Sequence, residues 1–257
     1  MNICLVGGTG MLGTVVLEHA IRAGHHVSLP NWDITTITGH HMRDCDVVIN
    51  CAGIVKQRIA DQPTESILQV NTVGPHHLAH IASTCKIRLI HVSTDCVFDQ
   101  PGGPYDEMSI PDASDLYALS KRGGEVNTPP HLTIRTSFVG FGRVGLIHDL
   151  QRSLRVKVSN RLMWSGHTVD TIAQLLVLLA ERRDISGLLH VPGTFQTRYT
   201  LARDLKARWD FPAILDRDDS YVADRRLISG NWTRWGLPGL PTFIEQLEVM
   251  KFRQVIE

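Results

Sequence analysis

Hydrophobic runs alternate with amphipathic stretches along the first two-thirds of the chain. Three short segments, Asn2–Val6, Asp46–Asn50 and Arg88–Val92, are mostly apolar on both faces, which is typical of buried strands in a parallel sheet. The stretches between them repeat apolar residues at helical spacing, which predicts helices over Met11–Ala23 and Thr64–Cys85. Strands and helices that alternate in this way predict a parallel sheet covered by helices on both faces.

Further elements complete this alternation. His26–Leu29 and Leu132–Val139 are expected strands, and Ser114–Val126 is an expected helix. Later in the chain, Val169–Glu181 predicts a strongly apolar helix and Leu188–Val191 a short strand. We expect this last helix and strand to rejoin the same sheet.

A glycine-rich turn, GGTGMLG at residues 7–13, follows the first strand and opens the first helix. Glycines permit a tight turn and let the backbone approach a pyrophosphate, which then lies at the positive end of the helix. The spacing of Gly7, Gly10 and Gly13 is that of short-chain dehydrogenases. We therefore predict a nicotinamide dinucleotide site, with NADPH or NADH as the cofactor. A purely structural strand-to-helix turn is the alternative.

The choice between the two cofactors is left open by the second strand. Such a strand normally ends in an acid that binds the adenosine ribose 2′-hydroxyl, or in a base that binds a 2′-phosphate. Ser28-Leu29-Pro30-Asn31 supplies neither. Asp33 follows shortly afterwards, and it is either a contact to the adenosine end of the cofactor or only a turn residue.

The predicted fold is α/β, a doubly wound parallel Rossmann sheet with a small discontinuous C-terminal substrate lobe. Residues 1–139 are expected to form the dinucleotide-binding domain, which residues 168–191 rejoin. The substrate lobe would consist of residues 140–167 and 192–257, a part rich in Trp and Arg. Within it we expect Asp210–Arg226 to be a loop, whose arginines either meet a nucleotide diphosphate or form surface ion pairs.

Composition narrows the class of partner. The 257 residues contain 26 Lys+Arg and 26 Asp+Glu, so charge favours neither nucleic acid nor a membrane surface. The longest apolar run, Leu175 to Ala180, is too short to span a bilayer, and the N-terminus lacks signal-peptide features. The five cysteines have no CxxC spacing, which is typical of reduced thiols. We expect a cytoplasmic enzyme with a small-molecule substrate, and a homodimer stays open.

Tyr117 and Lys121 are four residues apart on an expected helix, so both side chains lie on one face. A ketone that accepts a hydride becomes an alkoxide and needs a proton. A phenol with a pKa of about 10 is a poor donor near neutrality. We expect the Lys121 ammonium to lower the pKa of Tyr117 toward the working range, and to hold the nicotinamide ribose.

The fourth strand ends in Ser93-Thr94-Asp95. The carboxyl end of a parallel strand faces the ligand crevice, where the Thr94 hydroxyl can hydrogen-bond a substrate carbonyl as charge develops on it. Thr94, Tyr117 and Lys121 together predict an NAD(P)-dependent short-chain-type reductase. Three unrelated surface residues are the alternative interpretation.

A longer series of motifs resembles a known family. The strings GGTGMLG, VVINCAG, VNTVGP, HVSTDCVFD, YALSK and IRTSFV occur in the order and spacing of extended short-chain dehydrogenases. Within that group, STD-x-VF, YxxxKxxxE and IRTS are most similar to the dTDP-4-dehydrorhamnose reductase family. The resemblance covers roughly residues 1–190 and continues faintly in Arg225-Arg226-Leu227 and in Gly236–Pro241. It implies reduction of the 4-keto group of a nucleotide-activated 6-deoxysugar.

The resemblance also implies a role for each matching residue. Tyr117 would be the proton donor, Lys121 its partner, and Thr94 the hydroxyl that orients the carbonyl. Asp95 would touch the substrate, and Phe138 matches a family tryptophan that packs on it. The other matches imply cofactor contacts: Gly10, Met11 and Leu12 at the pyrophosphate, Ala52, Gly53 and Ile54 at the adenosine side, and Asn71 and Ser93 near the cofactor. A surface amide is the alternative interpretation of Asn71.

The chain departs from that family's pattern at three positions. Cys96 replaces a usual tyrosine, Phe138 the tryptophan, and Pro30 stands where an acid is usual. We expect Cys96 to have a packing role. Because these positions concern cofactor and sugar recognition, the substrate's identity stays open. A nucleotide-sugar epimerase or dehydratase of the same fold and a non-catalytic NAD(P)-binding regulatory subunit remain alternatives.

Two groups of histidines could suggest a metal site, the pair His40-His41 and the string HHLAH at residues 76–80. His76, His77 and His80 follow one another on an expected helix, but a zinc site needs further ligands and a shaped cavity. We interpret them as solvated surface residues and expect no metal.

Overall fold

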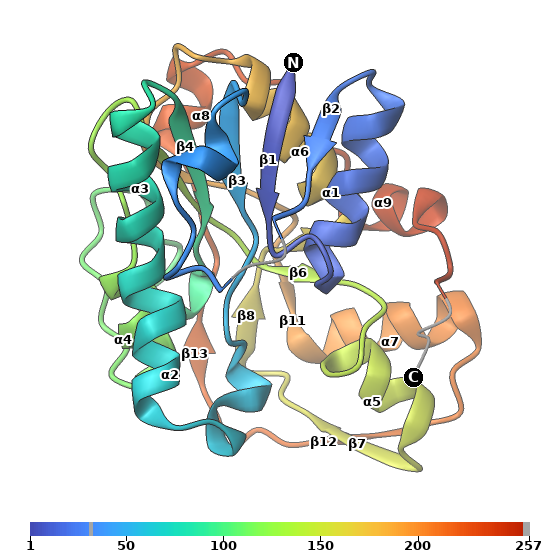
Figure 1. The fold of residues 1–257 in the computed structure, drawn as a ribbon. Coiled ribbons are helices and arrows are strands. Elements are labelled where there is room, and N and C mark those ends of the chain that lie inside the picture. The colour runs from blue at the N-terminus through green and yellow to red at the C-terminus, as the bar shows by residue number, and fades with distance from the viewer. Residues whose placement is uncertain (31–32, 254–257) are drawn as a thin grey trace.

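A six-stranded parallel sheet forms the centre of the computed structural model, which describes residues 1–30 and 33–253 (Figure 1). The strand order is β10-β5-β4-β3-β1-β2. Their bounds are β1 Asn2–Val6, β2 His26–Ser28, β3 Val47–Asn50, β4 Arg88–Val92, β5 Leu132–Arg135 and β10 Gly187–His190. The predicted doubly wound sheet is therefore confirmed. The order reverses between β1 and β3, and ligands of such sheets bind beyond the carboxyl ends of the strands at that point.

Helices cover both faces of this sheet. Figure 1 shows α1 (Met11–Arg22) and α6 (Val169–Glu181) on one side, and they pack against each other. On the other side lie α2 (Thr64–Leu68), α3 (Gly74–Thr84) and α4 (Leu116–Gly123). The two layers bury the sheet on both faces, as the apolar strands require.

Strand β1 shows how an apolar run becomes a central strand. Ile3 and Leu5 pack in the cluster that includes residues of α1 and α6. Cys4 and Val6 point to the opposite face and pack in the cluster that contains Leu78 of α3. Successive side chains of a strand face opposite sides of the sheet, so every position of β1 after Asn2 is buried.

Two expected elements are interrupted. The helix predicted over Thr64–Cys85 contains a π-helical segment, Gln69–Val73, between α2 and α3. The strand predicted over Leu132–Val139 ends at Arg135, because the chain then changes partner. Its continuation, β6 (Phe138–Val139), pairs with β9 (His167–Thr168) and leaves the central sheet.

The C-terminal part adds short sheets and helices below the carboxyl edge of the main sheet. Strand β7 (Arg155–Val158) pairs with β12 (Ile214–Arg217), and β8 (Leu162–Trp164) lies between β11 (Gln196–Thr197) and β13 (Ala223–Asp224). The prediction of a loop over Asp210–Arg226 is therefore wrong, because β12 and β13 lie within it. Helices α5 (Leu146–Arg152) and α7 (Arg198–Trp209) lie below this edge as well, whereas α8 (Gly230–Arg234) lies at the opposite edge of the main sheet (Figure 1). The last helix is α9 (Phe243–Val249).

The chain after β10 does not stay apart from the main sheet. Helix α8 contacts β10 of the main sheet, and α9 contacts β9 of the small sheet that β6 forms with it. The division into a dinucleotide-binding domain and a substrate lobe stays a prediction. Over the residues described, none of the helices combines the length and apolar character needed to traverse a bilayer.

Candidate active site

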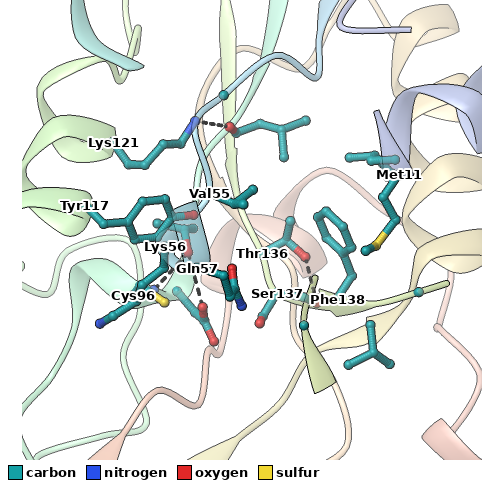
Figure 2. A pocket seen from close by; sticks show the side chains of 18 of the residues that line it. Met11, Val55, Lys56, Gln57, Cys96, Tyr117, Lys121, Thr136, Ser137 and Phe138 are labelled. Carbon is teal, nitrogen blue, oxygen red and sulfur yellow. Dashed lines mark hydrogen bonds between the residues drawn. The ribbon is translucent and has the colours of Figure 1, made fainter. Parts of the chain in front are cut away.

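A cavity of about 440 Å³ lies at the carboxyl ends of β1, β3 and β4. Figure 2 shows Tyr117 and Lys121 on one wall of it, with Met11 and Phe138 on the opposite wall. The cavity brings together most of the residues singled out in the sequence: Gly10, Met11, Leu12, Ala52, Gly53, Ile54, Ser93, Thr94, Asp95, Tyr117, Lys121 and Phe138. Gly7, Gly13, Asp33 and Asn71 do not line it.

The glycines of the first turn serve two different purposes. Gly7 has a φ of +78°, and a Cβ atom on it would lie 2.5 Å from the Ala52 nitrogen. A Cβ atom on Gly13 would lie 2.1 Å from the Gly7 oxygen. These two positions therefore need glycine for the chain to fold. Gly10 lines the cavity, and a Cβ there would meet only the Gly7 oxygen, at 3.4 Å.

The turn therefore fits a pyrophosphate. The space next to Gly10 is not filled by other residues of the chain. A side chain at this position would occupy the space that a ligand could use. Gly10 is also the N-cap of α1, without a side-chain cap, and the first turn carries no acidic residue. Backbone N–H groups at such a helix end bind anions.

Asn71 fixes the loop after β3. Its Oδ1 accepts a hydrogen bond from the Ile54 nitrogen at 2.8 Å, and its Nδ2 donates to the Ile54 oxygen at 3.0 Å and to Ser120 Oγ at 3.1 Å. The side chain is 0% exposed, so the surface-amide interpretation is wrong. Asn71 thus joins the Ala52–Ile54 loop to helix α4, which carries Tyr117 and Lys121.

Asp33 lies outside the cavity and is exposed. Its Oδ1 accepts hydrogen bonds from the Thr35 nitrogen at 2.8 Å and from Thr35 Oγ1 at 2.6 Å, and these bonds lower the pKa of the carboxyl. Such contacts are those of a turn residue. A contact from Asp33 to a cofactor stays a prediction, and Asn31 lies outside the described residues.

Thr94 is the N-cap of a short 3-10 turn, Asp95–Val97. Its Oγ1 accepts a hydrogen bond from the Cys96 nitrogen at 3.1 Å and donates to Asp95 Oδ1 at 3.3 Å. The side chain is 6% exposed. These bonds hold the Thr94 oxygen in the cavity wall, with its proton directed to Asp95.

The expected effect of Lys121 on Tyr117 is not found. Burial raises the pKa of the Tyr117 hydroxyl well above its ordinary value, the nearby Cys96 and Asp95 add to this, and contact with Thr94 opposes it. Lys121 is not among these causes, and its Nζ donates a hydrogen bond to the Val92 oxygen at 2.9 Å. Burial lowers the pKa of Lys121 itself to about 8. The prediction that Lys121 lowers the pKa of Tyr117 is therefore wrong.

A buried ion pair supports the cavity from behind. Arg135 donates to Glu125 through Nε at 2.8 Å and through a terminal nitrogen at 2.7 Å, and both side chains are 5% exposed. Ser93 Oγ donates to Glu125 Oε1 at 2.8 Å. The final Glu of the YxxxKxxxE pattern was the sequence signal for this role, which sequence reasoning missed.

The substrate side of the cavity includes residues that no local motif announced. They are Lys56, Gln57, Trp164 and Arg198. Ser137 of the IRTSFV string and Arg225 of the Arg225-Arg226-Leu227 segment also line the cavity, although no role was predicted for either. Trp164 Nε1 donates to Ser137 Oγ at 2.8 Å, which fixes the indole in the wall. Burial raises the pKa of Asp95, while Arg225 and a hydrogen bond from Ser137 oppose the rise.

Cys96 faces the same wall. Its Sγ accepts a hydrogen bond from Arg225 at 3.3 Å, and burial raises the pKa of the thiol to about 11. A protonated thiol is a poor nucleophile.

Outside the cavity, His76 and His77 hydrogen-bond to the backbone oxygens of Gly123 and Ile37, each at 2.8 Å, so they are not simply solvated.

Comparison with known sequences places the chain among nucleotide-sugar reductases. The model of the family described as RmlD substrate binding domain matches residues 1–216. A dTDP-4-dehydrorhamnose reductase of Mycobacterium tuberculosis is 31% identical over 209 residues, 74% of this chain and 69% of that protein. Subunit beta of methionine adenosyltransferase 2 from Xenopus laevis is 26% identical over 242 residues, 81% of this chain and 72% of that protein.

Solved structures share the fold. The dTDP-4-dehydrorhamnose reductase of Bacillus anthracis, crystallised in complex with NADP, superposes with a TM-score of 0.81 at 19% identity, over 96% of this chain and 97% of that one. A second such reductase, from Clostridium acetobutylicum, gives a TM-score of 0.82 at 19% identity with the same coverage. The sequence matches, together with a fold of this kind, show that the chain belongs to the dTDP-4-dehydrorhamnose reductase family of oxidoreductases.

Proposed function

We propose that the protein is an NAD(P)H-dependent reductase acting on the 4-keto group of a nucleotide-activated 6-deoxysugar. The observation that carries the proposal is the convergence of Thr94, Tyr117 and Lys121 on one cavity that also contains Gly10. Its volume lies within the range of about 300–1,000 Å³ that is usual for small-ligand sites. The similarity to a named dTDP-4-dehydrorhamnose reductase at 31% identity supports the substrate class.

The cofactor is NADPH or NADH. Gly10 and the start of α1 would hold its pyrophosphate, the Ala52–Ile54 loop its adenosine side, and Lys121 its nicotinamide ribose. When bound, the cofactor supplies the hydride that reduces the carbonyl carbon. A relative of known structure binds NADP, in line with this assignment.

The chain's own residues handle the oxygen and its proton. Thr94 would turn its hydroxyl proton from Asp95 Oδ1, which it contacts at 3.3 Å, to the substrate carbonyl oxygen as negative charge develops there. Tyr117 would give its phenolic proton to the same oxygen. Because the pKa of Tyr117 lies above its ordinary value, the hydroxyl carries its proton at every pH near neutrality but is a weaker acid than a free phenol. It would release the proton only as the carbonyl oxygen gains alkoxide character. Lys121, with a pKa of about 8, is largely charged at pH 7.

Asp95 and Phe138 would contact the sugar. Asp95 is 2% exposed and lies directly after Thr94, at the carboxyl end of β4. Phe138 lies across the cavity from Tyr117 and offers an apolar ring to the face of a deoxysugar (Figure 2).

A regulatory subunit is the second candidate function. The similarity to subunit beta of methionine adenosyltransferase 2 favours it, because that match covers 81% of this chain. Against it stands the complete set of Thr94, Tyr117 and Lys121 in one cavity, which a purely regulatory protein does not need. An epimerase or dehydratase of the same fold would use these residues too, but would keep its cofactor tightly bound.

A substrate panel tests the proposal. Purified protein is mixed with NADPH or NADH and a series of nucleotide-linked 4-keto-6-deoxysugars, and loss of reduced-nicotinamide absorbance is followed. We expect turnover with at least one of them and free exchange of the cofactor. Cofactor binding without turnover on any 4-keto sugar would favour the regulatory subunit, and a cofactor retained through purification would favour the epimerase.

A further inference from the structure

Two arginines of the C-terminal part reach the cavity, and one of them is fully engaged by the protein. Arg225 is 8% exposed. It donates through Nε to the Phe98 oxygen at 3.2 Å, and through its terminal nitrogens to Cys96 Sγ at 3.3 Å, to the Tyr221 hydroxyl at 2.6 Å and to Asp99. All of the guanidinium nitrogens of Arg225 therefore have partners within the chain.

Arg198 is different. It lines the cavity and is half-buried, yet its guanidinium makes no hydrogen bond or ion pair with any residue of 1–30 or 33–253. Several other arginines of this part of the chain pair with a nearby aspartate: Arg155 with Asp216, Arg203 with Asp204, Arg217 with Asp219 and Arg226 with Asp224. Arg198 keeps its donors available to the cavity.

The start of helix α7 holds Arg198 in place. Thr197, its N-cap, accepts a hydrogen bond from the Thr200 nitrogen at 3.0 Å and donates to Asn160 Oδ1 at 2.9 Å. The Tyr199 nitrogen donates to the Ser159 oxygen at 3.0 Å. These bonds tie the first turn of α7 to the segment between β7 and β8, so the backbone of Arg198 is fixed.

The surroundings of the guanidinium disfavour a charge that has no partner, since burial lowers the pKa of Arg198. Leu162 and Trp164 line the same cavity, and an apolar wall weakens the screening of a charge. Asp95 and Asp149 attract Arg198 from a distance, while Arg225 repels it. Asp95 lies beyond ion-pair distance of Arg198 and shares its charge with Arg225 and Ser137. A half-buried cation without a close partner is costly, and a ligand anion would remove that cost.

We infer that Arg198 is a specificity-determining residue that binds an oxyanion of the substrate. The inference rests on the proposed function, because it concerns the substrate of the same site. The planar guanidinium fork matches two oxygens of a phosphate or of a carboxylate. In a nucleotide sugar these oxygens belong either to the diphosphate or to an acidic group on the sugar.

Binding measurements without turnover test the inference. Calorimetric titrations compare wild type, Arg198→Gln and the matched control Arg203→Gln, whose side chain is exposed on the same helix. The probes are dTDP, UDP, thymidine, UDP-glucose and UDP-glucuronic acid. We expect Arg198→Gln to weaken binding of the better nucleoside diphosphate at least tenfold, to leave any thymidine binding unchanged, and Arg203→Gln to match wild type.

The other outcomes are equally decisive. If Arg198→Gln leaves both diphosphates unaffected but removes a wild-type preference for UDP-glucuronic acid over UDP-glucose, the oxyanion is a sugar carboxylate. Equal binding of every probe by wild type and Arg198→Gln overturns the inference, as does a wild type that binds no probe. If Arg198→Gln does not fold, Arg198→Lys takes its place, since it keeps the charge but loses the fork. The two proposals can fail separately. If no sugar of the substrate panel is reduced but diphosphate binding still depends on Arg198, the proposed reaction is contradicted and the inference about Arg198 stands.

Discussion

The ammonium of Lys121 donates a hydrogen bond to the backbone oxygen of Val92, with 2.9 Å between Nζ and O. Val92 is the last residue of β4, so this bond joins the helix that carries Tyr117 to the strand that leads to Thr94. The Nζ also lies 3.6 Å from the position of a Cβ atom on Gly53. Lys121 is therefore held at the cofactor side of the cavity, and the Tyr117 hydroxyl stays protonated without its help.

Burial of Lys121 predicts that the free energy of unfolding depends on pH. Its pKa falls from 10.5 to about 8 on folding, so between these values the unfolded chain binds more protons. Wild-type stability should therefore gain up to about 3 kcal/mol from this group as pH rises from 8 to 10.5. Lys121→Met lacks that gain, so its stability relative to wild type should decrease over this window. Denaturant unfolding at several pH values measures the difference, and a constant difference would show that Lys121 has an ordinary pKa.

Substitutions at Gly10 and Gly13 should have different effects, one on cofactor binding and the other on stability. Gly10→Val should fold, because Gly10 has an extended backbone, φ −78° and ψ 171°, and its Cβ position meets only the Gly7 oxygen, at 3.4 Å. The added side chain enters the cavity and should reduce NADPH affinity at least tenfold. Gly13→Val should instead destabilise the fold, since its Cβ atom would overlap the Gly7 oxygen.

Thermal unfolding and calorimetric titration with NADPH separate the two effects. A Gly10→Val variant that binds the cofactor as wild type does would mean that the turn is only structural. A Gly13→Val variant as stable as wild type would contradict the close packing of the turn.

Asn71 should matter for both stability and cofactor affinity. Asn71→Ala leaves the Ile54 N–H and C=O groups without their partners, and such losses each cost about 1–3 kcal/mol. We expect a loss of at least about 2 kcal/mol in denaturant unfolding, with weaker NADPH binding because the Ala52–Ile54 loop is released. Thr84→Ala, which removes a single exposed hydrogen bond to the His80 oxygen, is the control and should change neither.

The protein should discriminate only weakly between NADH and NADPH. The described end of β2, Ser28-Leu29-Pro30, offers no charged side chain, and the Asp33 carboxylate is engaged by Thr35. We predict that kcat/KM for NADH and NADPH differ by no more than about tenfold, or about 1.4 kcal/mol. A hundredfold preference for either cofactor would mean that another residue recognises the 2′ position.

The central sheet was predictable because burial on both faces leaves a strong local pattern. The bounds predicted for Asn2–Val6 and Arg88–Val92 coincide with β1 and β4. The end of β5 at Arg135 was not predictable, since it depends on pairing between Phe138–Val139 and His167–Thr168, about 30 residues later. The strands within Asp210–Arg226 were missed for the same reason, because they are short and pair with distant β7 and β8.

The candidate site divides in a similar way. Gly10, Thr94, Tyr117 and Lys121 belong to compact motifs whose spacing reflects local geometry, and all of them line the cavity. Arg198 carries no motif, and only the packing of α7 against the rest of the chain brings it to the cavity. The pKa of Tyr117 was predicted with the wrong sign, because burial and the nearby Cys96 and Asp95 all raise it, and neither burial nor these contacts are visible in a sequence.

Catalysis by Tyr117 is the centre of the account, and replacing its hydroxyl tests it most directly. The measurement is the steady-state kcat of wild type and Tyr117→Phe on the nucleotide 4-keto sugar that wild type reduces, with Thr94→Val assayed beside them. Removing the proton donor should lower kcat at least about a hundredfold with a smaller change in KM, because general acid catalysis contributes about 10²–10⁴ in rate. Thr94→Val should cost less, since it removes one hydrogen bond. Near wild-type kcat in Tyr117→Phe would contradict the account, because another acid, such as Asp95, would then have to donate the proton.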